Sequence, residues 1–171
     1  YKERLYHAVF NRHMLSAFEM SESRMAEYAD IIDRFRPETI VSYVAPVVKL
    51  SEWLLANGRK PWRPQRVLGA AEALHESQRE LIERAFGCPA YNTYGCREFM
   101  LIAAECEHRK GLHVNADHLR VELSAALGSD ERGPRDIVIT DLHNYGMPLL
   151  RYMNGDLATP GGLECKCGRG L

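Results

Sequence analysis

Residues 64–74, PQRVLGAAEAL, join a short apolar run to a turn made of small residues. An apolar run that ends in glycine and alanine is typical of a buried strand that leads into a helix. Two comparable segments flank this stretch, ETIVSYVAP at 38–46 and CPAYNTYGCRE at 88–98. The spacing leaves room for a helix in each connection. Strand, helix, strand, helix, strand in this order predicts parallel pairing with right-handed crossovers.

Apolar residues with helical spacing fill the segments before and between these strands. The first helix begins after Ser21, a residue type favoured at helix N-caps, and ends before Pro37. The second ends at Gly58 and the third at Gly87, because glycine readily terminates helices. The apolar positions that carry the spacing are Met25, Tyr28, Ala29, Ile32 and Phe35, then Val47, Leu50 and Leu54, then Leu81, Ile82, Ala85 and Phe86.

The pattern changes after the third strand. DHLRVELS at 117–124 alternates apolar and polar residues, and RDIVITDL at 135–142 and GMPLLRYM at 146–153 are also strand-like. Turn-forming residues separate these strands, which predicts antiparallel pairing. The predicted fold class is therefore α/β, a parallel strand–helix–strand layer followed by a β-rich portion. We expect two parts within one larger domain, residues 1–105 with a helical lead-in and the α/β layer, and residues 106–171 with the β-rich portion.

Composition excludes several classes of partner. The chain has 171 residues with 22 basic and 23 acidic side chains, so its net charge of -1 provides no basic field for nucleic acid or for a membrane surface. No apolar run approaches the roughly 20 residues that span a bilayer. The first residues show neither an initiator methionine nor a signal sequence, and we expect a fragment of a longer protein. Five cysteines without a secretory signal predict a reducing, cytoplasmic location.

Three turns follow predicted strands, where ligands of open α/β sheets bind. GAAEAL at 69–74 would let a flat ring approach the backbone, although alone it favours a plain strand-to-helix turn. NTYGCRE at 92–98 offers Tyr94 for stacking on a base and Glu98 as an oxygen ligand for Mg²⁺, although alone it is better explained by a loop with a solvated glutamate. RYMNGDLA at 151–158 places an aspartate where it can accept hydrogen bonds from sugar hydroxyls, although Asn-Gly is also a hairpin signal.

The order of the motifs is more specific than any one of them. GAAEAL, NTYGCRE, GLHVNADHLRVEL, MPLLRYMNGDLA and CKCGR together resemble the adenylate-forming superfamily of acyl-CoA ligases. The resemblance is to the phenylacetate–CoA ligase branch, which includes capsule-biosynthesis relatives, and it runs from about Ser21 to the end of the chain. It implies the central part of the large N-terminal domain of an ATP-dependent ligase. Such enzymes join a carboxylic acid, for example an aryl acid, to coenzyme A through an acyl-adenylate.

The resemblance also implies roles for individual residues. Asn92 and Tyr94 would contact the edge and face of adenine, Glu98 would hold the Mg²⁺ bound to ATP, and Asp156 would bind the ribose hydroxyls. Glu98 is thus the implied catalytic residue. The full set implied to bind the nucleotide, AMP or ATP, is Gly69, Ala70, Ala71, Asn92, Tyr94, Gly95 and Asp156.

Two positions depart from the family pattern. Arg97 stands where the family usually has Ser or Thr, and Met153 and Asn154 stand where it usually has Arg and Thr. The family's phosphate loop would precede Tyr1, and the mobile domain with its catalytic lysine would follow Leu171. We therefore expect this chain alone to be inactive.

The terminal sequence CKCG is open to three interpretations: half of a metal site, a redox pair, or two incidental thiols. Cys106 and His113 would complete a Cys₃His set with Cys165 and Cys167, which suffices for a closed tetrahedral Zn²⁺ site. His108 is a rival ligand. The resemblance implies zinc at this cluster in some family members. Four protein ligands leave no open position for substrate, so the expected role of the metal is structural.

Three hypotheses follow. The first is the nucleotide-binding part of a carboxylate–CoA ligase with ATP, Mg²⁺ and coenzyme A as small-molecule partners. The second, which Arg97 favours, is a module that binds a nucleotide or a partner without turnover. The third is a zinc-stabilised structural domain without a nucleotide site.

Overall fold

The computed structural model describes residues 2–124, 133–161 and 164–169. The chain forms two compact units, the first ending at Asn92 and the second beginning at Thr93. The boundary expected after residue 105 coincides with the end of a strand inside unit 2. None of the helices in the described part of the chain combines the length and apolar character needed to cross a bilayer.

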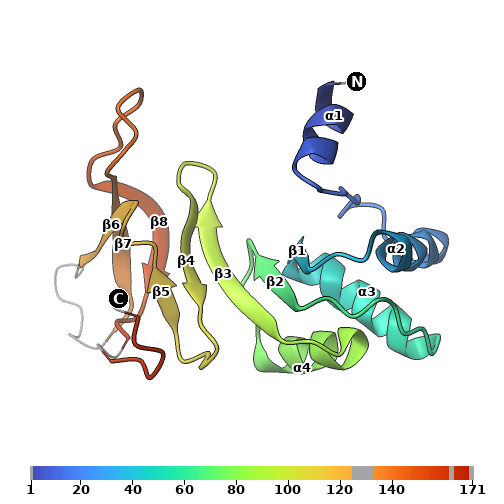
Figure 1. Ribbon diagram of the computed structural model, residues 1–171. Helices are drawn as coiled ribbons and strands as arrows, with labels where there is room; N and C mark the ends of the chain where they lie inside the picture. The colour runs from blue at the N-terminus through green and yellow to red at the C-terminus, as the bar shows by residue number, and fades with distance from the viewer. Residues whose placement is uncertain (1, 125–132, 162–163, 170–171) are drawn as a thin grey trace. The chain divides into compact units, whose positions relative to one another are not determined.

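Unit 1 is an α/β layer (Figure 1). It contains α1 (Lys2–Val9), α2 (Glu22–Phe35), β1 (Thr39–Tyr43), α3 (Val44–Ala56), β2 (Arg66–Ala70), α4 (Glu76–Phe86) and the first half of β3 (Ala90–Cys96). The strands pair in the order β1-β2-β3 and both pairs are parallel, which confirms the predicted layer. Each crossover connects a strand to the next strand on the same side, first β1 to β2 and then β2 to β3. The two crossover helices, α3 and α4, therefore lie side by side on one face of the strands.

The helices of unit 1 begin and end where local chemistry requires. The Ser21 hydroxyl accepts a hydrogen bond from the backbone N–H of Arg24 and thereby caps α2. Arg36 closes that helix in the left-handed region at φ 51°, directly before Pro37. Gly87 closes α4 at φ 68°.

The apolar faces of these helices make the core of unit 1. Tight packing of aliphatic side chains between α2, α3, α4 and the strands removes them from water, which is the main stabilising contribution to such a layer. The buried cluster consists of Met25, Ala29, Ile32, Val44, Val47, Leu50, Leu54, Val67, Leu74, Ile82, Ala85, Phe86, Cys88 and Ala90.

Unit 2 is antiparallel throughout its described residues, as the alternating sequence pattern predicts. It contains the second half of β3, then β4 (Met100–Glu105), β5 (Leu112–Val114), β6 (Leu119–Ser124), β7 (Arg135–Asp141) and β8 (Tyr152–Ala158). In this unit β3 pairs with β4 and β4 with β5, while β6-β7-β8 form a separate three-stranded sheet. A small core of Phe99, Ile102, Leu119, Ile137 and Ile139 packs under these strands.

The last strand differs from its predicted position. β8 begins at Tyr152, whereas the pattern of GMPLLRYM predicts a strand over 146–153. Pro148 lacks a backbone N–H for a strand ladder, and Arg151 lies in the left-handed region at φ 49°. The chain therefore becomes regular only after Arg151.

The connection between β3 and β4 depends on Gly95. The sequence predicts a glycine turn here, but β3 continues to Cys96, and Gly95 lies at a bulge between the two strands. A Cβ atom on Gly95 would overlap the carbonyl oxygen of Met100 in the facing strand. Only glycine allows this close approach of two backbones.

We expect Gly95→Ala to lower the free energy of unfolding by about 3 kcal/mol or more, because the methyl group forces the two strands apart. Denaturant unfolding followed by circular dichroism measures this change. The matched control is Gly146→Ala, where a new Cβ would lie 3.8 Å from its nearest neighbour. Equal stability of the two variants would contradict the close-approach explanation.

Candidate functional site

The turn after β2 lies against the start of α3. A Cβ on Gly69 would lie 3.2 Å from Val44 Cγ2, so a side chain at this position would press on α3. Ala71 follows the strand in the left-handed region, at φ 65°. Gly69 is also the register partner of Asn92 on β3. Unit 1 therefore brings together the end of β2 and the first polar residue of β3, both of which the sequence predicts as nucleotide-binding.

Glu72, in the same turn, has a role that the sequence pattern does not predict. Its Oε2 accepts a hydrogen bond of 3.1 Å from the backbone N–H of Ala45, in the first turn of α3. The N-cap residue of that helix, Tyr43, provides no side-chain hydrogen bond. A carboxylate from another segment thus caps α3, where unsatisfied N–H groups and the helix dipole favour negative charge.

In unit 2, Tyr94, Asn154 and Asp156 form a closed polar network. The Tyr94 hydroxyl donates to Asp156 Oδ2 at 2.7 Å. The Asn154 side-chain amide donates to the Tyr94 oxygen at 2.6 Å and to Asp156 Oδ2 at 2.8 Å. Burial is the largest cause that raises the pKa of Tyr94; the hydrogen bond from Asn154 opposes this rise and the bond to Asp156 adds to it, so the hydroxyl keeps its proton and acts as a donor.

A bulge in β8 presents this network. Asp136 pairs with Leu157 and Val138 with Met153, so three residues of β8 lie opposite the single residue Ile137. Gly155, in the middle of the three, has φ 85°. The Asn-Gly pair is therefore part of a strand bulge, and the interpretation as a hairpin turn is wrong. Bulges redirect side chains away from the regular pleat.

Glu98 lies in the exposed turn between β3 and β4. Hydrogen bonding from the Cys96 thiol is the chief reason that its pKa is lowered, with Tyr152 and the charge of Arg97 as smaller causes. The carboxylate is therefore ionised at neutral pH and reachable from solvent. Such an oxygen donor suits a hard cation such as Mg²⁺.

Four metal-ligating side chains converge in unit 2. The ligand atoms of Cys106, His113, Cys165 and Cys167 all lie within 4.8 Å of one another. The Cys106 and Cys165 sulfurs are 3.6 Å apart, and Cys167 Sγ lies 3.5 Å from His113 Nε2. Zinc–sulfur bonds of about 2.3 Å in a tetrahedron require ligand separations of about 3.7 Å. The distances and the thiol–imidazole donor set therefore fit Zn²⁺.

Backbone and side-chain contacts support these ligands. The N–H of His108 donates to Cys106 Sγ and that of Arg169 to Cys167 Sγ, both at 3.4 Å. The bond from His108 is the largest cause that lowers the pKa of Cys106 to about 6, which favours the thiolate that a metal requires. Glu107 and Arg169 form an ion pair of 2.9 Å between the two halves of the cluster. His108 contributes its backbone, and its ring is outside the cluster.

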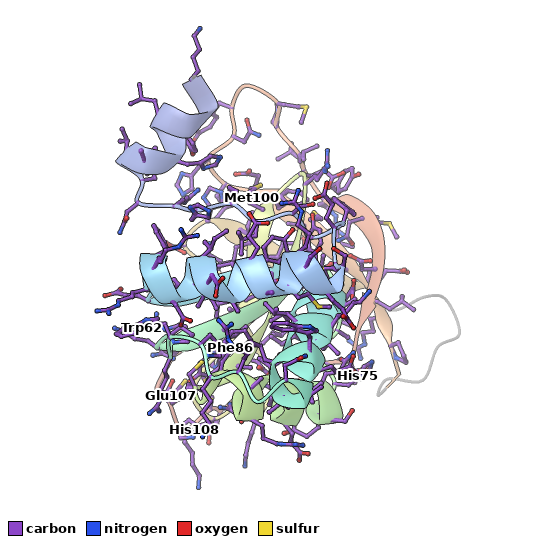
Figure 2. The ribbon with its side chains drawn as sticks, turned by 90° about the vertical axis from the view of Figure 1, so that its right-hand side faces the viewer. Trp62, His75, Phe86, Met100, Glu107 and His108 are labelled. Carbon is purple, nitrogen blue, oxygen red and sulfur yellow. The ribbon has the colours of Figure 1, made fainter. Side chains whose placement is uncertain are left out.

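The metal cluster and the Gly95 turn are separated within unit 2. Met100 begins β4, and Glu107 and His108 follow its end, so the two features lie at opposite ends of this strand (Figure 2). A metal at the cluster would therefore act on the structure of the unit rather than at the turn that carries Glu98.

An apolar cavity of about 530 Å³ lies in unit 1, between residues 11–17, α2, β1 and α3. Its lining includes Met14, Ile32, Ile40 and Leu50. The sequence-predicted site residues are absent from this lining. The cavity is thus separate from the turn after β2.

Comparisons with known proteins agree with the motif order. No protein-family model matches the chain. It is 26% identical over 152 residues to Protein CapK of Staphylococcus aureus, a match that covers 88% of this chain and 33% of that protein. It is 32% identical over 151 residues to phenylacetate-coenzyme A ligase of Thermus thermophilus, covering 81% of this chain and 33% of the relative. The chain thus spans about one third of the length of these relatives.

The fold agrees as well. The structure of a 2-hydroxyisobutyryl-CoA ligase, in complex with 2-HIB-AMP and CoA, superimposes with a TM-score of 0.76 at 19% identity, covering 88% of this chain and 35% of that one. The fold is therefore that of the CoA ligases. The relatives named phenylacetate-CoA ligase and CapK, together with the CoA-ligase fold, support the adenylate-forming CoA ligase branch and confirm the resemblance seen in the sequence.

We expect Glu72→Ala to lower the free energy of unfolding by about 1 kcal/mol, the usual effect of losing a helix N-cap. Denaturant unfolding measures this difference, and the control is Glu80→Ala, because Glu80 is an exposed residue of α4. A Glu72→Ala variant as stable as the control would show that the bond to Ala45 contributes nothing to folding.

Proposed function

We propose that this chain is the central, nucleotide-binding portion of an ATP-dependent carboxylate–CoA ligase similar to phenylacetate–CoA ligases. The observation that carries the proposal is the coincidence of sequence similarity to phenylacetate-coenzyme A ligase with the fold of a CoA ligase. The polar network of Tyr94 and Asp156 supports it, because it joins an aromatic ring to a carboxylate that can accept sugar hydroxyls.

The residues proposed to bind adenine lie at the end of β2, directly after it, and on β3. Gly69, Ala70 and Ala71 in unit 1 would line the adenine pocket, and Asn92 would contact the adenine edge. The absence of large side chains at the end of β2 supports this role, since a flat ring can then approach the backbone.

The remaining roles belong to unit 2. Tyr94 would offer its ring to adenine, and Gly95 would allow the close turn that follows. Asp156 would accept hydrogen bonds from the ribose. Glu98 would hold Mg²⁺, which when bound neutralises phosphate charge. The lowered pKa of Glu98 supports this role, because it keeps the carboxylate charged.

The reaction has two steps. The substrate carboxylate attacks the α-phosphorus of ATP and the bond to pyrophosphate breaks, which leaves an acyl-adenylate. The thiol of coenzyme A then attacks the acyl carbonyl, releases AMP and a proton, and forms the thioester. Both reactants of the first step are anions, so precise positioning and charge compensation determine its rate.

An aryl acid is the proposed substrate class, and the name of the 32% identical relative supports it. We place the activity in the cytoplasm, where thiol ligands stay reduced. Zn²⁺ at Cys106, His113, Cys165 and Cys167 would act as a clamp. Residues Cys106 and Cys165 are 59 positions apart, so a metal that binds only the folded site would couple its binding free energy to the folding of this long segment.

Carboxylate-dependent ATP–pyrophosphate exchange tests the ligase function in a protein that contains this chain at the length of its relatives. We expect exchange with at least one acid from a broad aryl and aliphatic panel. Glu98→Gln should lower the rate about 100-fold or more, because a neutral amide holds the magnesium–phosphate charge poorly.

Glu80→Gln, on an exposed helix surface, is the control and should keep the wild-type rate. Absence of exchange with every acid would sink the ligase function. Such a result together with tight ATP binding would leave a nucleotide-binding module without turnover.

Metal content measured by plasma mass spectrometry tests the clamp. We expect about one zinc per chain, lost in the Cys165→Ser/Cys167→Ser variant and in His113→Ala. The control is His108→Ala, which should keep the metal because that ring is outside the cluster. Zinc retained by His113→Ala but lost by His108→Ala would assign the fourth ligand to His108 instead.

A further inference from the structure

Asn154 is the centre of the polar network in unit 2. Its amide nitrogen donates to two acceptors, the Tyr94 oxygen at 2.6 Å and Asp156 Oδ2 at 2.8 Å. Its carbonyl oxygen accepts the backbone N–H of Asp156 at 3.2 Å. The partners determine the orientation of the amide, since a carboxylate accepts and a backbone N–H donates.

The bulge in β8 makes these contacts possible. In a regular strand, residues two apart stand nearly parallel on the same face and do not bond to each other's backbone. Gly155, at φ 85°, turns the chain so that Asn154 reaches the N–H of Asp156 in an Asx-type turn. The direction of the Asp156 carboxylate is therefore set by Asn154 rather than by the pleat.

The network leaves one carboxylate oxygen for a ligand. Asp156 Oδ2 accepts hydrogen bonds from both Tyr94 and Asn154. Within the described part of the chain, both side-chain hydrogen bonds of this carboxylate end at Oδ2. Asp156 is exposed, so Oδ1 keeps its full capacity to accept hydrogen bonds from a bound molecule.

We propose that Asn154 is a positioning residue that sets selectivity for a ribonucleotide, by holding Asp156 Oδ2 so that Oδ1 accepts the ribose hydroxyls. This inference rests on the proposed nucleotide-binding function. Asn154 also ties the carboxylate to the Tyr94 ring, so the groups for sugar and base move as one. A threonine at this position would have a single hydroxyl donor and could not bridge both partners.

Calorimetric titration of the 171-residue chain with AMP and with 2′-deoxy-AMP tests this inference. We expect the wild-type chain to bind AMP about tenfold or more tightly than 2′-deoxy-AMP, the usual value of one hydrogen bond to a charged group. In Asn154→Ala the preference should fall to within about twofold, through weaker AMP binding. A general loss of stability would weaken the binding of both nucleotides equally and would leave the ratio of the two affinities unchanged.

Two further variants sharpen the test. Tyr94→Phe keeps the aromatic ring but removes the hydroxyl. This variant should still bind 2′-deoxy-AMP but should show a smaller preference for AMP. It replaces Asn154→Ala in the test if Asn154→Ala does not fold. Met153→Ala is the matched control, because this neighbouring side chain is 57% exposed and apolar. It should keep the wild-type preference.

The outcomes separate this inference from the function on which it rests. If Asn154→Ala and Tyr94→Phe both prefer AMP as strongly as the wild-type chain does, the positioning role is overturned and the nucleotide-binding role is left intact. A folded wild-type chain that binds neither nucleotide overturns the nucleotide-binding role of the chain, and the positioning role with it. The positioning role is supported if Asn154→Ala and Tyr94→Phe lose the preference for AMP while Met153→Ala keeps it.

Discussion

The strand β3 hydrogen-bonds in parallel to β2 through its first residues and antiparallel to β4 through its last. After Thr93 and Tyr94 of β3 have paired with β4, a bulge at Gly95 brings the backbone of Met100 so close that a side chain does not fit. Both polar residues implied in base binding, Asn92 and Tyr94, lie on this strand. The close backbone contact at Gly95 and the residues proposed to bind the base therefore belong to the same strand.

The metal cluster and the polar network are two different ways of holding the β-rich unit. Cys106 and His113 gather the end of β4 and β5 with the terminal cysteines, and the ion pair of Glu107 and Arg169 reinforces that contact. The network of Tyr94 and Asp156 instead joins β3 to β8. The Cys/His cluster lies at one end of β4, and the separate polar network contains the exposed carboxylate of Asp156.

The sequence predicts what is local. Helical spacing and the Ser21 cap predict α2, and alternation predicts the antiparallel strands of unit 2. The sequence suggests Cys106, His113, Cys165 and Cys167 as one donor set, with His108 as a rival, and the structure brings the ligand atoms of those four residues within 4.8 Å of one another. The bulge opposite Ile137 and the capping of α3 by Glu72 are not predictable in this way. They depend on strand register and on contacts between distant segments, for which one sequence carries no periodic signal.

The bulge that contains Asn154 and Gly155 also bears on chemical ageing of the chain. A glycine after asparagine does not shield the backbone nitrogen, so Asn-Gly is the sequence most open to succinimide formation and deamidation. Here three hydrogen bonds restrain the amide of Asn154. If the amide were lost, a second carboxylate would face Asp156, and a donor would become an acceptor. The integrity of this one side-chain amide therefore sets how long the carboxylate keeps its orientation.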